Sequence, residues 1–274
     1  MTRLFKFAFI LLSLLLPVSA YSGTIRTSIT TSQRVTSQGT IELDFKIRNR
    51  GDVTAHKVVF SLILAGVVRS YASLGDNPPG EEIRVKETLA DLSLRPGKYW
   101  AVVRVGFEEQ TGKVHHVYHF FEIPYFTDRM RSPGLPLSLE TIGPCFNKKA
   151  FWDKSGAIRL SMKNEGTEDL RLNSWLFLPE GVTSPEPNRS YALSPGETRM
   201  ESVPVHMEPD MRTLRSYHLI VWCVHDQTHY SWDLKGTIRV QDQPVYFKGY
   251  VVAGMVLLAL LFGALLVRNR RTKL

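Results

Sequence analysis

The stretch IELDFKIR at residues 41–48 decides the fold of this chain. Its four apolar side chains alternate with four charged ones, so one side of the segment suits a core and the other suits water. Strict alternation of this length is typical of a half-buried antiparallel strand, because successive side chains point to opposite faces. Asn49 and Gly51 follow directly. Both residue types tolerate the positive φ of a tight turn, so we expect the strand to end there.

Apolar and alternating runs of strand length continue along the chain, and no comparably long stretch between the two terminal segments has helical periodicity. In the first half, strands are expected at residues 58–65, 67–74, 82–89, 98–107 and 114–123. In the second half, they are expected at residues 158–163, 170–178, 197–207, 217–224 and 229–240. These runs predict an all-β chain.

The two halves repeat the same landmarks at nearly the same spacing. Asn49-x-Gly51 is followed 30 residues later by Pro79-Gly80-Glu81. Asn164-x-Gly166 is followed 31 residues later by Pro195-Gly196-Glu197. In each half a Tyr then opens a hydrophobic strand. Three matched landmarks indicate an internal duplication.

Each repeat spans about 100 to 110 residues with about seven strands, which is the profile of an Ig-like β-sandwich. Tyr99 and Tyr217, which open the matching strands, occupy positions that suit either a tyrosine corner or an ordinary core Tyr. The expected sandwiches span residues 21–125 and 135–243, with a polar, turn-rich linker at 126–134. The predicted fold class is therefore all-β, with two tandem Ig-like antiparallel β-sandwiches followed by one C-terminal transmembrane helix.

This order of motifs resembles the CARDB and NEW3-type Ig-like domains of cell-surface proteins. The best local match is Asn164-Glu165-Gly166 together with Leu193-Ser194-Pro195-Gly196-Glu197. The first copy departs from the pattern, since Asn77-Pro78-Pro79-Gly80-Glu81 has no Leu two residues before the final Pro. The resemblance covers about two-thirds of the chain and implies an Ig-like fold used for adhesion, spacing or assembly.

The N-terminal segment, residues 1–20, has the layout of a secretory signal. Arg3 and Lys6 precede an apolar run at residues 7–16, and the small-residue pattern Val18-Ser19-Ala20 closes it. Cleavage is expected after Ala20. An uncleaved N-terminal anchor is the alternative, although the apolar run is short for a membrane span.

A second apolar run, residues 249–267, contains no charge and is long enough to cross a bilayer as a helix. The basic tail at 268–274 is expected to stay in the cytoplasm by the positive-inside rule. The residues expected to form the anchor are Tyr250, Val251 and Val267 in the span and Arg268, Arg270 and Arg271 in the tail. We therefore expect a single-pass protein of the inner (plasma) membrane, with its domains in the periplasm or outside the cell.

The net charge of +8, from 34 Lys and Arg against 26 Asp and Glu, would by itself suggest a nucleic-acid or anionic membrane partner. Six of the basic residues lie in the two terminal segments: Arg3, Lys6, Arg268, Arg270, Arg271 and Lys273. The remaining 28 nearly balance the 26 acidic residues. We therefore do not expect a basic face that binds nucleic acid.

Cys145 and Cys223 are the only cysteines, and both fall in the second repeat, on the expected oxidising side of the membrane. An even cysteine count there favours one disulfide. Two buried free thiols are the first alternative, and metal ligation is the second.

Four histidines are candidate metal ligands: His115, His119, His225 and His229. The first two lie four residues apart on one face of a predicted strand. The other two flank a turn near Cys223, with Met207 and Met211 nearby in sequence, and sulfur with imidazole would suit copper. Solvated strand histidines are the alternative, so no metal or cofactor is assigned.

No local catalytic motif such as G-x-S-x-G or H-E-x-x-H occurs, so we expect a protein that is not an enzyme. The five tryptophans suit either the core or a platform for stacking sugars: Trp100, Trp152, Trp175, Trp222 and Trp232. The leading hypothesis is a membrane-tethered, non-catalytic protein whose two domains bind a protein partner or an envelope polymer. The alternatives are a periplasmic copper-binding or copper-delivery protein and a polysaccharide-binding module.

Overall fold

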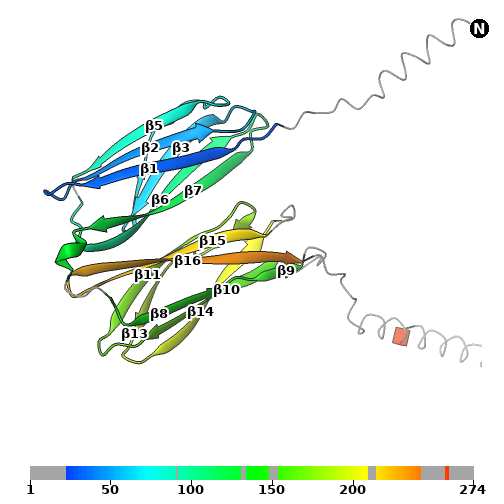
Figure 1. Cartoon of the computed structure of the whole chain (residues 1–274). Coiled ribbons are helices and arrows are strands. Elements are labelled where there is room, and N and C mark those ends of the chain that lie inside the picture. The colour runs from blue at the N-terminus through cyan, green and yellow to red at the C-terminus, as the bar shows by residue number, and fades with distance from the viewer. Residues whose placement is uncertain are drawn as a thin grey trace, which may run out of the picture. The chain divides into compact units, whose positions relative to one another are not determined.

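The computed structural model describes residues 23–90, 92–130, 134–147, 154–208, 214–241 and 257–258. These residues form an all-β chain of several sheets, as predicted (Figure 1). The first seven strands are β1 (Thr27–Val35), β2 (Ile41–Asn49), β3 (His56–Leu64), β4 (Val67–Ser70), β5 (Glu82–Leu89), β6 (Gly97–Glu108) and β7 (Val114–Tyr125). After the short 3-10 helix η1 (Thr127–Arg129) come β8 (Leu137–Ile142), β9 (Cys145–Asn147), β10 (Ser155–Asn164), β11 (Leu170–Phe177), β12 (Val182–Thr183), β13 (Asn188–Leu193), β14 (Thr198–Met207), β15 (Arg215–His225) and β16 (Thr228–Gln241).

The chain divides into two compact units. The first comprises the chain up to Leu92 together with Ala101–Phe121. The second comprises Ser93–Trp100 and the chain from Glu122 onward, so the first residues of β6 and the last of β7 belong to it.

In the first unit, β1, β2 and β5 form one antiparallel sheet, and β4, β3, β6 and β7 pair in a second. The alternation at residues 41–48 is confirmed, because Ile41, Leu43, Phe45 and Ile47 are all at most 2% exposed. Phe45 packs on Phe60 of β3, with ring centroids 5.0 Å apart. The apolar face of β2 thus packs against the second sheet of this unit.

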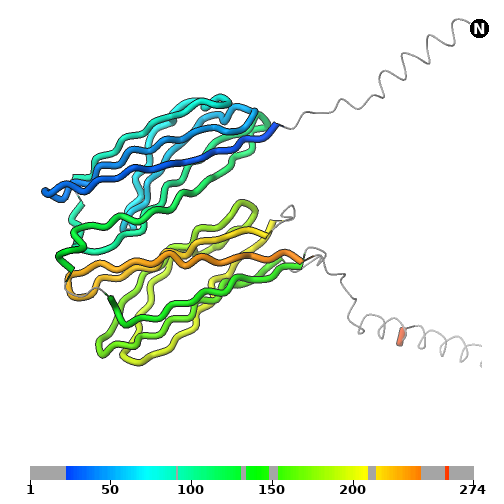
Figure 2. Tube along the Cα trace, in the orientation of Figure 1, coloured from blue at the N-terminus to red at the C-terminus, as the bar shows by residue number. Residues whose placement is uncertain are grey.

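In the second unit, the strand orders are β12-β14-β10-β8 in one sheet and β13-β11-β15-β16 in the other (Figures 1 and 2). A single buried cluster joins the two sheets. It includes Ile158 and Leu160 of β10, Val203 of β14 and Tyr217 and Val221 of β15. The two sheets of this unit therefore pack face to face around one core, because each strand turns its apolar side inward.

Each unit contains the same buried asparagine. The amide of Asn49 donates to the carbonyls of Val53 at 2.7 Å and Asn77 at 2.9 Å, and its oxygen accepts from the Gly51 N–H at 2.9 Å. In the second unit, Asn164 does the same. Its amide donates to Glu168, Leu193 and Ser194, and its oxygen accepts from the Gly166 N–H. We call this arrangement the asparagine clamp.

The clamp explains the spacing of the repeated landmarks. The backbone N–H of Asn49 donates to Glu81 O at 3.1 Å, and that of Asn164 donates to Glu197 O at 3.0 Å. The N-x-G and P-G-E motifs of each half therefore meet across the fold. A β-carbon at Gly166 would press on Pro136 of the segment that enters the second unit, which explains the glycine of that motif. The matched landmarks of the two halves thus occupy equivalent positions and make equivalent hydrogen bonds.

The predicted signal at 1–20 lies outside the described residues. So do the anchor residues Tyr250, Val251, Val267, Arg268, Arg270 and Arg271, since only Leu257 and Leu258 of the predicted span are described. Within the described part of the chain, no helix has the length and apolar character needed to span a bilayer.

Candidate functional site

The two cysteines do not form the predicted disulfide, and both are free thiols in the structure. Cys223 belongs to the buried core cluster of the second unit, whereas Cys145 is exposed on β9, where it is paired with Arg239 of β16. Burial raises the pKa of the Cys223 thiol to about 12. The disulfide prediction failed here because it used only the number of cysteines and their compartment, and neither places one sulfur in the core.

His115 and His119 do not come together at one site. Both lie on β7, and residues four apart in a strand are separated by about 13 Å. His115 Nε2 lies 2.7 Å from Glu109 Oε1, and its ring stacks on Phe107. His119 stacks on Phe121, and its partial burial lowers its pKa. Although His115 and His119 lie on the same face of β7, they are too far apart to bind one metal ion together.

His225 and His229 lie on opposite faces of the β15–β16 hairpin. His225 is paired with Thr228, and His229 is paired with Val224, so the alternation of side chains points the two rings apart. His229 is 4% exposed, its Nδ1 donates to Lys98 O at 2.8 Å, and its ring stacks on Tyr99 at 3.7 Å. Burial lowers its pKa to about 4. The two candidate ligands therefore do not meet at one site in the structure.

Tyr99 forms a tyrosine corner, one of the two roles that the sequence allowed for it. Its hydroxyl donates to Arg95 O at 2.9 Å and accepts from Arg95 N–H at 3.0 Å. The hydroxyl of Tyr217 instead lies 2.8 Å from Thr141 Oγ1, so this residue is a core Tyr with a side-chain hydrogen bond. The two matching tyrosines therefore have different roles.

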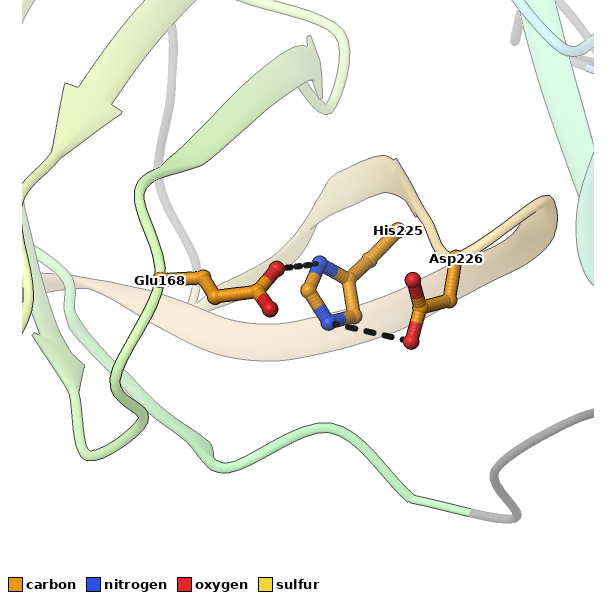
Figure 3. A group of neighbouring side chains, drawn as sticks. All are labelled: Glu168, His225 and Asp226. Atoms are coloured by element: carbon orange, nitrogen blue, oxygen red, sulfur yellow. Dashed lines mark ion pairs between the residues drawn. The ribbon is translucent and has the colours of Figure 1, made fainter.

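The structure does bring His225 together with two carboxylates, Glu168 and Asp226 (Figure 3). Glu168 Oε2 lies 3.8 Å from His225 Nδ1, and Asp226 Oδ2 lies 3.9 Å from Nε2. One ligand atom from each of the three residues falls within 4.8 Å of the others. This His–carboxylate cluster is the candidate functional site.

Local backbone structure positions both carboxylates. The asparagine clamp holds Glu168, because Asn164 Nδ2 donates to the Glu168 carbonyl at 2.8 Å. Asp226 and Gln227 form the two-residue turn between β15 and β16, with φ of 49° and 59°. Positive φ at both central residues is what a type I′ hairpin turn requires, and it fits the twist of the two strands. The turn therefore places Asp226 directly beside the ring of its neighbour.

A pocket of ≈ 290 Å³ adjoins the cluster. Leu135, Pro136 and Leu170 form its apolar wall, and Thr167, Glu168 and His225 contribute polar groups. Asp226 is not among the lining residues. The open space therefore lies on the Glu168 edge of the imidazole ring.

The tryptophans do not form one platform in the second unit. Trp232 packs against the core cluster, whereas Trp175 and Trp222 alternate with core residues and so lie on the other face of their sheet. All three are half-buried, as is Trp100, and Trp152 lies outside the described residues. Trp232 therefore fits the core reading, whereas Trp175 and Trp222 lie outside the core cluster.

Sequence reasoning identified His225 but missed Glu168 and Asp226. Asp226 could have been identified from its position between two predicted strands, because a turn there keeps its side chain close to His225. The signal for Glu168 is its position four residues after Asn164, which the clamp fixes. Neither residue belongs to a known metal-binding spacing, so a motif search passes over both.

No protein-family model and no curated protein matches the chain. A protein of unknown function from Porphyromonas gingivalis W83 is similar in structure, with 12% identity over 78% of this chain and 99% of its own, and a TM-score of 0.36. Escherichia coli alpha-2-macroglobulin activated by porcine elastase matches at 12% identity and a TM-score of 0.31, over 80% of this chain and 22% of its own. Red sea bream transglutaminase matches at 15% identity and a TM-score of 0.25, over 80% of this chain and 31% of its own. This chain spans less than a third of the last two proteins, and no function is taken from any of the three.

Proposed function

We propose that this protein is a single-pass, membrane-tethered, non-catalytic binding or assembly protein. It presents two Ig-like β-sandwiches outside the cytoplasm to a protein partner or an envelope polymer. The sequence features that support this are the secretory layout of residues 1–20, the apolar run at 249–267 and the basic tail behind it. The resemblance to CARDB and NEW3-type domains points the same way, since such domains serve mainly in adhesion, spacing and assembly.

The observation that carries the proposal is the duplicated asparagine clamp. Both units have the same buried amide, with matching hydrogen bonds to the turn glycine and to the segment around P-G-E. What is repeated is therefore a scaffold. The chemical groups differ between the copies, because the residue held by Asn49 is Val53 and the residue held by Asn164 is Glu168. The two units share a backbone framework but not the polar side chains around it. Such a framework suits a protein whose domains space and present binding surfaces.

Affinity purification of the intact protein from a detergent extract, after brief crosslinking in cells, tests this proposal. The matched control keeps residues 1–20 and 242–274 but carries an unrelated β-domain between them. The proposal expects at least one envelope component that is recovered with the protein and not with the control. Recovery of the same components with both would overturn it, as would recovery of none. Prior digestion of the envelope polysaccharide separates a glycan partner from a protein partner.

A further inference from the structure

The His–carboxylate cluster has the wrong distances for hydrogen bonds. An N–H···O hydrogen bond spans about 2.7 to 3.2 Å, whereas the two carboxylates lie 3.8 and 3.9 Å from the ring nitrogens of His225. Two ligands that each lie about 2.0 to 2.2 Å from one ion are separated by about 3 to 4 Å. Both spacings therefore match a pair of ligands better than a direct hydrogen bond, and the position of the pocket decides which edge of the ring binds the ion.

The two carboxylates lie at opposite edges of the imidazole ring, so they cannot both bind an ion at the same ring nitrogen (Figure 3). A neutral imidazole offers a lone pair on one nitrogen and an N–H on the other. Metal-binding histidines usually donate that N–H to a carboxylate, which fixes the tautomer and the ring orientation. The arrangement here provides for both roles, with one carboxylate at each nitrogen.

We propose that His225 Nδ1 and the Glu168 carboxylate bind a divalent transition-metal ion, and that Asp226 positions the ring by accepting the Nε2 proton. The side chain of Asp226 is 56% exposed, so a small rotation or one bridging water closes its distance to Nε2. This inference is independent of the proposed function, because a tethered binding protein needs no metal.

The pocket supports the assignment of the two edges. It lies on the Glu168 side of the ring and has a volume of ≈ 290 Å³. One water occupies about 30 Å³ of liquid volume, so the space holds the waters that complete the coordination of an ion with two protein ligands. The Thr167 and Glu168 side chains supply polar groups next to that space.

The first repeat serves as an internal comparison. The asparagine clamp holds the residue four positions after the asparagine in both units, and that residue is Val53 in one and Glu168 in the other. The scaffold therefore does not require a carboxylate at this position. The carboxylate is therefore present in the second unit alone, where it faces His225.

The donor set decides which metals suit the site. Cys223 and Met207, two of the sulfur residues that favoured copper in the sequence, are buried in the core cluster, and Met211 lies outside the described residues. Imidazole and carboxylate suit Cu(II), Zn(II) and Ni(II). The Irving–Williams order then predicts the tightest binding for Cu(II) and weak binding for Mn(II).

The test is a titration of the full-length, chelator-stripped protein in detergent with Zn(II) and with Cu(II), followed by calorimetry and, for Cu(II), by electron paramagnetic resonance. We expect one site per chain with coupling from one imidazole nitrogen. Glu168→Val, which copies the first repeat, and His225→Ala should each weaken binding at least tenfold. Asp226→Asn should weaken it about 10- to 100-fold, as for other orienting carboxylates, and Asp226→Glu should recover most of the loss.

Two other histidines provide matched controls. His56 forms an exposed pair with Asp76 at 2.8 Å, and His206 lies 3.0 Å from Ser155 Oγ. His56→Ala and His206→Ala should leave affinity and stoichiometry unchanged. Binding that persists in both Glu168→Val and His225→Ala, or that falls equally in the controls, would overturn the proposal, as would the absence of binding in the unaltered protein. If His225→Ala fails to fold, Glu168→Val decides the question, because the Glu168 side chain is 69% exposed.

Discussion

Asn164 and Asn49 are fully buried polar residues whose side chains replace backbone pairing at the turns of the two units. Truncation of Asn164 to Ala leaves the carbonyls of Glu168 and Ser194 and the N–H of Gly166 without that amide. A buried group that loses its partner costs about 1 to 3 kcal/mol. We expect Asn164→Ala to lower the free energy of unfolding of its unit by about 3 kcal/mol.

Denaturant unfolding of the full-length protein in detergent measures this effect. The same loss is expected in the first unit for Asn49→Ala, because the two clamps match. The control is Asn188→Ala at the exposed start of β13, which should change stability by no more than about 0.5 kcal/mol. An Asn164→Ala variant as stable as the control would show that the clamp is not a structural requirement.

His229 makes the second unit sensitive to acid. Its Nε2 is buried without a hydrogen-bond partner among the described residues, so protonation would place an uncompensated charge there. Burial lowers its pKa from the ordinary value of 6.5 to about 4. Because the unfolded chain binds the proton more readily, stability is fully present above pH 6.5 and is lost as the pH falls toward 4, by up to about 3 kcal/mol.

Unfolding of the unaltered protein and of His229→Phe across this pH range isolates the effect. Phenylalanine keeps the ring that stacks on Tyr99 but has no proton to bind, so its stability should depend less on pH between 6.5 and 4. Parallel pH curves for the two proteins would rule out His229 as the cause.

The hairpin of β15 and β16 has two non-glycine residues at positive φ, Asp226 and Gln227. A side chain in the left-handed region costs roughly 1 to 2 kcal/mol relative to glycine, which is partly offset by the greater entropy of glycine in the unfolded chain. We therefore expect Gln227→Gly to stabilise the second unit by up to about 1 kcal/mol in thermal unfolding. Destabilisation would mean that the turn has another conformation.

The placement of the cysteines on β9 and β15 makes a further prediction about thiol reactivity. Under native conditions Cys145, which is exposed, should be alkylated, whereas Cys223 should react only after unfolding, because its raised pKa and burial suppress the thiolate. Mass spectrometry of protein from its native compartment measures both. Cys145 and Cys223 peptides found joined under non-reducing conditions would restore the disulfide and contradict the structure.

Strands with one clearly apolar face were predictable from sequence, whether central or at an edge, and strands without such a face were not. The predicted strand at 82–89 coincides with β5, and that at 170–178 nearly coincides with β11. These strands bury one face, so their apolar pattern is clear. β1 was missed because TSITTSQRV has only half-buried or exposed side chains and pairs with one neighbour, β2. β8 has the same difficulty, since none of its side chains is fully buried.

The candidate site was only partly predictable, because its residues meet through the pairing of distant elements. His225 was recognisable in the sequence because imidazole is a common metal ligand. The face of the sheet on which it lies, and the residues beside it, depend on the register of β15 with β16. That register separates it from His229 and leaves Cys223 in the core. Glu168 arrives from the turn after β10, and no sequence spacing relates it to His225.

The whole molecule consists of two β units of matching construction and two apolar terminal segments. Duplication of the asparagine clamp explains why N-x-G and P-G-E recur at spacings of 30 and 31 residues. In the proposed function, the terminal segments place this scaffold outside the cytoplasm and residues 249–267 tether it. The proposed presentation of two domains to a partner depends on that topology.

Reporter fusions measure this topology directly. A reporter that is active only outside the cytoplasm should be active when fused after Val240, where β16 is ending, and inactive when fused after Leu274. The same pair of fusions with a reporter active only in the cytoplasm should give the opposite pattern, which controls for unstable fusions. Activity of the export-dependent reporter after Leu274, or its inactivity after Val240 with a stable fusion, would contradict the membrane-tethered arrangement.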